Sequence, residues 1–209
     1  MPKIPTFKAP PEYYDLWRTS IEHPEAFWGK LAEQSMPDIY WFKKWDKVLE
    51  ITYPRFKWFA GGVTNAAYNC VSYKLPRYKE KVAYIHEAPE LGISRTVTYG
   101  ELFEIVAKYS AALRSFGIRK GERVLLYLPN SIEAVSMLLA CAKIGGISTC
   151  VFAGFSAGAL ADRIELTRPK LVFTQDFTLR RGRKVELKNL VNEALNLCSK
   201  EATGGVKYK

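Results

Sequence analysis

Residues 120–152, KGERVLLYLPNSIEAVSMLLACAKIGGISTCVF, contain the pattern that decides the fold. The run RVLLYL (123–128) is nearly all apolar and ends at a proline, which is typical of a parallel strand buried on both faces. Ser131 can cap a helix that continues to Lys143, and a second buried-type strand follows at 147–152 after two glycines. Strand, helix and strand with short connections predict a βαβ unit.

The same alternation continues towards the N-terminus. Val82–His86 is predicted as a strand, and Arg95–Thr98 as a second short extended piece. Thr98 precedes Glu101 by three residues, the spacing of a capping box that opens a helix. Apolar side chains then recur every three or four residues, as on one face of a helix: Leu102, Val106, Tyr109, Leu113 and Phe116.

Towards the C-terminus the pattern predicts a helix at 156–166, a strand at 171–174 and a last helix at about 188–198. Counting from the strand at 82–86, strands and helices alternate. The sequence therefore predicts the α/β class, with an open, parallel, doubly wound sheet.

The first part of the chain has a different character. All five tryptophans lie before residue 60, and five prolines interrupt its short helical patterns. We expect this aromatic-rich, irregular segment to wrap over a neighbouring domain and bury its rings there. The predicted division is a wrapping segment at 1–66 and the first part of a larger domain at 67–209.

Composition excludes several classes of protein. The chain has 209 residues, is 48% hydrophobic, and carries 31 basic and 21 acidic side chains, so its net charge is +10. Such a composition excludes a disordered chain. No apolar run reaches the ~18 residues of a membrane span, and no secretory signal is recognisable. The four cysteines form no C-x-x-C pair, which disfavours zinc and favours a cytoplasmic location.

The sequence GFSAG (154–158) fits the G-x-S-x-G pattern between a strand and a helix, the setting of a serine hydrolase nucleophile. In that fold the histidine base follows the serine, whereas His23 and His86 both precede Ser156. Ser156 without an imidazole is a poor nucleophile. We therefore interpret Ser156 as a helix cap.

Asp176–Lys184 follows the strand at 171–174 and carries four cations, namely Arg180, Arg181, Arg183 and Lys184. Ligands of open parallel sheets bind beyond the carboxyl ends of the strands, and arginine binds phosphate through paired hydrogen bonds. The residues alone leave two readings open, a solvated basic turn or a phosphate site. A nucleic-acid site is disfavoured, because the cations gather at one loop and the tail rather than along an element.

Seven ordered motifs resemble the N-terminal part of AMP-forming acetyl-CoA and propionyl-CoA synthetases, which are adenylate-forming ligases. The likeness extends from about Tyr13 to Leu190. The motifs are SIEHPEAFW (20–28), WFKKWDKVLE (41–50), KWFAGGVTNAAYNCV (57–71), TVTYGEL (96–102), residues 120–146, VFAGFSAGALADRI (151–164) and RRGRK (180–184).

This resemblance implies a function and a set of site residues. The family activates a short carboxylic acid with ATP to an acyl-adenylate, from which the CoA thiol displaces AMP. The loop matching Arg180, Arg181, Gly182 and Arg183 is expected to bind the 3′-phosphate of CoA. The segment Phe152, Ala153 and Gly154 is expected to lie against the adenine, with Ala153 where the family often has glycine.

The resemblance also implies what the chain lacks. The family's ATP phosphate loop, acyl pocket and C-terminal lysine come later than this sequence extends, so we expect no catalysis from it alone and assign no catalytic residue or metal ligand. ATP and magnesium would be bound only by the longer enzyme. The expected partners are CoA and a short carboxylate, without nucleic acid or membrane. Alternatives are a non-catalytic CoA- or nucleotide-binding module, and a subunit that needs a separately encoded remainder. An unpaired sheet edge predicts self-association.

Overall fold

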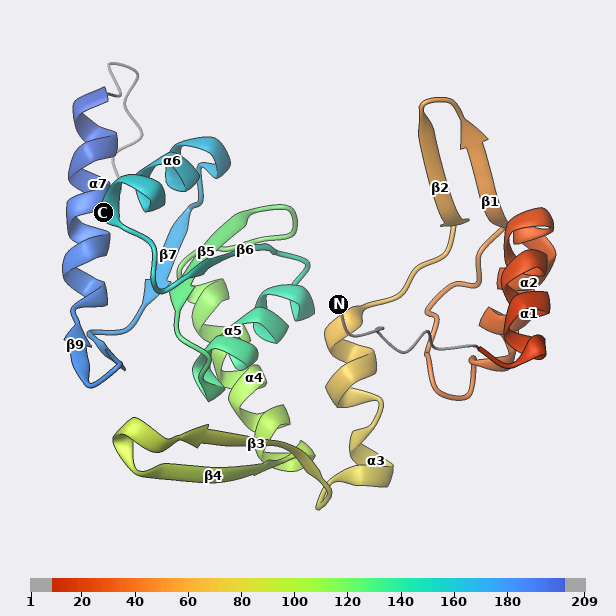
Figure 1. Cartoon of the computed structure of the whole chain (residues 1–209), viewed down its shortest axis with the longest axis horizontal. Helices are drawn as coiled ribbons and strands as arrows, with labels where there is room; N and C mark the ends of the chain where they lie inside the picture. Colours follow the sequence, from red (N-terminus) through yellow and green to blue (C-terminus); the bar gives the residue numbers. More distant parts are fainter. Residues whose placement is uncertain (1–8, 202–209) are drawn as a thin grey trace, which may run out of the picture. The chain divides into compact units, whose positions relative to one another are not determined.

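The computed structural model describes residues 9–201, which belong to two compact units that meet in sequence between Thr64 and Asn65 (Figure 1). The first unit contains two helices and a hairpin, and the second contains the parallel sheet. Each unit is described by itself below. None of the helices in these residues is both long and apolar enough to cross a membrane.

The first unit consists of α1 (Pro11–Glu22), α2 (Pro24–Gln34), β1 (Lys47–Thr52) and β2 (Arg55–Ala60). Both helices begin with proline, whose fixed φ suits a first helical position where no hydrogen-bonded N–H is needed. The two strands pair antiparallel, with Leu49 opposite Trp58. The prolines therefore start these helices, and each helix stays short.

Aromatic rings cluster in this unit, and among those that the structure describes Trp45 is the one that is buried. Trp41, Trp45 and Phe59 pack against one another, with ring centroids 4.9–5.6 Å apart. The ring of Trp58 packs edge-on against Trp28 and at a tilt against Phe59. Such edge contacts suit the ring quadrupole. The burial of these rings against another domain stays a prediction.

The second unit is built on a three-stranded parallel sheet in the order β6–β5–β7. The strands are β5 (Arg123–Leu128), β6 (Ile147–Phe152) and β7 (Leu171–Thr174). The central strand β5 is buried along five of its six residues, which confirms the prediction drawn from the run RVLLYL.

Helices cover both faces of this sheet (Figure 1). One face packs against α4 (Tyr99–Ser115) and α5 (Ile132–Lys143), and the other against α6 (Ala157–Thr167) and α7 (Leu187–Glu201). Each face has its own apolar cluster, because alternate side chains of β5 point to opposite sides. The predicted doubly wound α/β class is confirmed.

The predicted helix caps are also confirmed. Thr98 and Glu101 form a reciprocal capping box at the start of α4. The hydroxyls of Ser131 and Ser156 accept backbone N–H bonds at the starts of α5 and α6, respectively. Each cap satisfies a backbone donor that the first helical turn leaves without a partner.

The first strand of the predicted alternation is placed differently. Residues Val82–Ala88 form β3, which pairs antiparallel with β4 (Ile93–Thr98) and not with the parallel sheet. Only a short 3₁₀ turn, Pro89–Leu91, and Gly92 connect the two strands. A connection this short permits a hairpin, whereas a parallel pairing needs a long crossover. A π-helical turn (Tyr68–Ser72) and α3 (Leu75–Tyr78) precede this hairpin.

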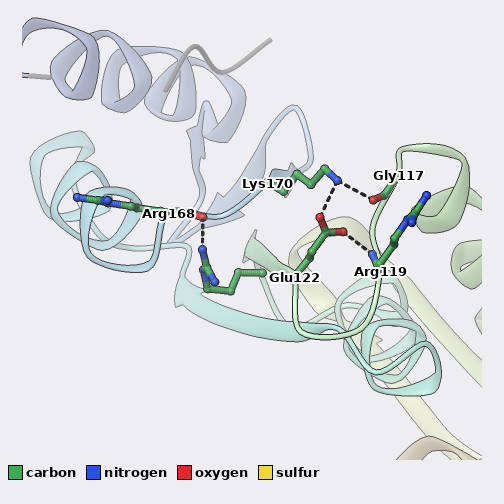
Figure 2. A network of polar contacts seen from close by, with 6 residues as sticks. Gly117, Arg119, Glu122, Arg168 and Lys170 are labelled. Atoms are coloured by element: carbon green, nitrogen blue, oxygen red, sulfur yellow. Dashed lines mark hydrogen bonds and ion pairs between the residues drawn. The ribbon is translucent and has the colours of Figure 1, made fainter. Parts of the chain in front are cut away.

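A polar network joins β7 to the loop before β5, at the amino ends of the strands (Figure 2). Lys170 Nζ donates to Glu122 Oε1 and to the carbonyl of Gly117, both at 2.7 Å. The second oxygen of Glu122 accepts the backbone N–H of Arg119. The hydrogen bond from Lys170 is the largest of the effects that hold the pKa of Glu122 below its ordinary value.

Candidate functional site

The predicted basic loop at Asp176–Lys184 is an ordered hairpin. Strands β8 (Thr178–Arg180) and β9 (Arg183–Val185) pair antiparallel, with Arg180 opposite Arg183. The two turn residues, Arg181 and Gly182, have φ of +52° and +71°. A two-residue turn with positive φ at both positions matches the twist of a hairpin. The turn therefore presents arginines on a folded support.

The arginine hairpin meets the loop that follows β6. The guanidinium of Arg180 lies over the ring of Phe152, 5.3 Å from its centroid. Gly154 lies beside both groups, since a Cβ on Gly154 would overlap Nη1 of Arg180 and Cε1 of Phe152. The structure thus brings together Arg180, Phe152 and Gly154, which the sequence placed in two separate segments.

This meeting point lies where the chain order of the sheet reverses. From β5 the chain crosses to β6 on one side, and from β6 it returns to β7 on the other side. The crevice outside the carboxyl ends of the strands at such a switch point is the usual ligand site of open α/β sheets. Phe152 keeps 58% of its surface exposed here, so a flat ligand has access to its ring.

A buried side chain of the core holds the loop after β6 in place. The hydroxyl of Tyr127, on β5, donates to the carbonyl of Phe155 at 2.7 Å. Burial raises the pKa of Tyr127, so its hydroxyl remains a donor at neutral pH. Phe155 also packs edge-on against Phe152 and lies under the guanidinium of Arg163, 4.4 Å from the ring centroid. Ala153 is buried and supports the loop without reaching its surface.

The cations of the hairpin differ in their partners. Lys184 pairs with Glu186 at 2.8 Å and lies over the ring of Phe177. In the part of the chain that the structure describes, Arg180, Arg181 and Arg183 form no ion pair with a carboxylate. Their charges are therefore not neutralised within the site. Clusters of three or more His, Cys, Asp or Glu side chains that could hold a metal are absent from residues 9–201.

One contact of the site was missed from the sequence. Glu90, in the turn between β3 and β4, accepts the backbone N–H of Gly182 at 3.3 Å. Ninety-two residues separate the two partners, and an isolated glutamate in a turn carries no pattern that would reveal the contact. It connects the tip of one hairpin to the tip of the other.

Comparisons with known proteins identify relatives over most of the chain. A family profile described as "AMP-binding enzyme" matches residues 72–207, past Leu190, where the resemblance was expected to end. A second profile, "Acetyl-coenzyme A synthetase N-terminus", matches residues 13–70. Among solved structures, an acetoacetyl-CoA synthetase from Streptomyces lividans superposes with a TM-score of 0.80 at 31% identity, covering 90% of this chain and 28% of that one.

Curated relatives carry related names. Acetyl-coenzyme A synthetases from Chlorobaculum tepidum and Helicobacter pylori are 43% and 45% identical, covering 88% and 90% of this chain. A 3-hydroxypropionyl-coenzyme A synthetase from Sulfurisphaera tokodaii is 44% identical and covers 88%. The chain spans only 27–28% of the length of these three proteins.

Proposed function

Because this chain belongs to the AMP-binding enzyme family, we propose that its Arg180–Phe152 surface is the CoA subsite of a longer AMP-forming ligase for short carboxylic acids. In that reaction ATP and the acid give an acyl-adenylate and pyrophosphate, and CoA then displaces AMP. The observation that carries the proposal is the contact of Arg180 with Phe152 beside Gly154.

The chemistry of the surface fits the adenosine 3′-phosphate end of CoA. Arg180, Arg181 and Arg183 supply planar donors for a phosphate dianion, whereas the N–H of Gly182 is donated to Glu90. The exposed ring of Phe152 offers a face for the adenine. The missing side chain at Gly154 leaves room for the guanidinium of Arg180 and the ring of Phe152 to lie close together, and Ala153 is buried.

The isolated chain is proposed to bind without catalysing. Its relatives are more than three times as long as the matched region, which is 27–28% of their length. We place the ATP phosphate loop, the acyl pocket and the adenylating lysine in that remainder, so that ATP and magnesium are bound only by the longer protein. The segment at 1–66 is proposed to wrap over the larger domain that starts at 67.

The same partial coverage favours a second proposal. The chain could work as a CoA-binding module that has no catalytic role, or as a subunit completed by a separately encoded remainder. Purification of the tagged chain from its own cells distinguishes these cases. A stoichiometric partner that contains the family's missing motifs would support the subunit, whereas purification of the chain alone would support the module.

Calorimetric titration with CoA and with 3′-dephospho-CoA tests the proposed subsite. A charge-assisted contact to the 3′-phosphate is worth about 1.5–3 kcal/mol, so dephospho-CoA should bind at least about tenfold more weakly. Arg180→Ala should abolish this preference. Equal affinity for the two ligands, or no binding of either, would contradict the proposal.

Arg119→Ala is a matched control because it removes the same charge elsewhere. Arg119 follows α4, and its backbone N–H donates to Glu122 in the network at the amino ends of the strands (Figure 2). The variant should therefore keep the preference for CoA over dephospho-CoA. If both variants weaken CoA binding equally, the effect comes from net charge rather than from the hairpin.

A further inference from the structure

The turn of the arginine hairpin contacts a carboxylate from a distant part of the chain. Glu90 lies in the short turn between β3 and β4, and its Oε1 accepts the backbone N–H of Gly182 at 3.3 Å. The turn that carries Glu90 also lies beside strand β8, so the tips of the two hairpins are neighbours within the second unit (Figure 1). This contact places a negative charge next to the turn formed by Arg181 and Gly182.

The charge of Glu90 is not neutralised by a side chain. Glu90 is exposed, and within residues 9–201 its carboxylate forms no ion pair. By contrast Glu186, which follows β9, is paired with Lys184 at 2.8 Å. Glu90 therefore reaches the arginine hairpin through the N–H of Gly182 and leaves the guanidinium groups available to a ligand.

The N–H of Gly182 is a donor that a phosphate could also use. Carboxylate and phosphate oxygens are both charged acceptors, and both form strong hydrogen bonds with a backbone N–H. Gly182 lies between Arg181 and Arg183 in the chain, and a Cβ on Gly182 would meet no atom within 4 Å. A phosphate bound by the arginines thus has open access to this N–H, but the carboxylate of Glu90 is already there.

We propose that Glu90 competes with the 3′-phosphate of CoA for the turn of the arginine hairpin and thereby determines which anions the site accepts. This inference rests on the proposed CoA subsite. Two negative charges beside one N–H repel each other, so the phosphate must displace the carboxylate. A small inorganic anion has the arginines alone to offset this cost. A ligand whose base also packs on Phe152 has a second source of binding free energy.

Two substitutions in the full chain separate competition from a structural role. Glu90→Gln keeps an acceptor for the N–H of Gly182 and removes the charge, whereas Glu90→Ala removes both. Exposed charge interactions are weak, so we expect both variants to bind CoA about two- to fivefold more tightly than the wild type in calorimetric titration. Their affinity for 3′-dephospho-CoA should stay unchanged. A purely structural contact predicts the opposite pattern, with weaker CoA binding in Glu90→Ala and normal binding in Glu90→Gln.

Glu87→Gln is the matched control for the loss of charge. Glu87 is an exposed residue of the same β3–β4 hairpin, and its Oε1 accepts the hydroxyl of Ser94 on the paired strand at 2.7 Å. The control variant should bind both ligands like the wild type. If it strengthens CoA binding as much as Glu90→Gln does, the effect comes from net charge and the proposal is overturned.

A titration with inorganic phosphate tests the competition without CoA. The amide resonance of Gly182 is followed by NMR in the wild type and in both Glu90 variants. The resonance should move on addition of phosphate, and half of the change should occur at an about two- to fivefold lower concentration in the variants. An equal or higher concentration in the variants, or a Gly182 resonance that phosphate does not move, would overturn the proposal.

The two titrations also distinguish this inference from the proposed function. If CoA and 3′-dephospho-CoA bind equally while phosphate binds more tightly to Glu90→Gln, the CoA subsite is wrong and the competition stands. If the wild type prefers CoA but the Glu90 variants have the same affinities as the wild type, the subsite stands and the competition is wrong. If no variant responds to either ligand or to phosphate, both are wrong.

Discussion

Replacing Gly154 with alanine would show whether the arginine hairpin and the loop after β6 act as one site. The added Cβ would overlap Nη1 of Arg180 and Cε1 of Phe152. Both atoms are at the ends of side chains, so the guanidinium and the ring can move aside. The backbone can stay in place, because Gly154 does not adopt positive φ. We therefore expect a folded protein whose arginine no longer lies over the ring.

The binding free energy for CoA should weaken by about the contribution of the hydrogen bond that the displaced Arg180 no longer makes to the ligand. A charge-assisted hydrogen bond contributes about 1.5–3 kcal/mol, which corresponds to a loss of about 10- to 150-fold. Binding of 3′-dephospho-CoA, which lacks the 3′-phosphate, should change less. Stability should change by no more than about 0.5 kcal/mol, since the site is on the surface. The expected shift in Tm is then below about 2 °C.

Gly158→Ala is the matched control for this measurement. Gly158 belongs to the same GFSAG segment but lies in α6, where an added Cβ would meet nothing within 4 Å. This variant should bind CoA like the wild type and gain up to about 1 kcal/mol of stability from the better helix propensity of alanine. The reasoning is refuted if Gly154→Ala binds CoA as tightly as the wild type, or if its Tm falls by many degrees.

Two further predictions concern the thiols and the polar network. Burial raises the pKa of the Cys141 thiol to about 11, so in a time course of alkylation at about pH 8 the exposed Cys70 and Cys150 should be labelled first. Labelling of Cys141 at an equal rate would contradict the buried position. Lys170 holds the pKa of Glu122 low, so their pairing stabilises the fold at neutral pH and loses this effect as the pH falls through the lowered pKa. Glu122→Gln should lower Tm at about pH 7 and have little effect near pH 2, and a pH-independent difference would disprove the interaction.

Local signals were sufficient to predict most of the second unit. The run at 123–128 lies between two strands and two helical layers, so both of its faces are buried. Its residues are therefore apolar without alternation, and this pattern can be recognised from the sequence. Thr98, Ser131 and Ser156 marked helix starts because a cap depends only on residues three positions away.

Pairing between segments was harder to predict. The strand at 82–86 was assigned to the parallel sheet, although its short connection to the next strand makes a hairpin with β4. The basic loop was not recognised as a hairpin either, because Arg181 adopts a positive φ that arginine seldom favours. Arg180 and Phe152 come into contact because the loop after β6 and the hairpin after β7 meet at the carboxyl ends of the strands. No local sequence pattern indicates how far apart these two segments lie.

The buried hydroxyl of Tyr127 makes the hydrophobic core and the recognition loop interdependent. This side chain is fully buried in the central strand, yet it holds the carbonyl of Phe155 one residue beyond Gly154. A substitution at Tyr127 therefore changes folding and ligand contact together. The arginine hairpin is held differently, since its arginine side chains are exposed and the N–H of Gly182 in its turn donates to the exposed Glu90. Adaptation to a new ligand in this scaffold is consequently less constrained in the hairpin than in the loop, and redesign of specificity should begin there.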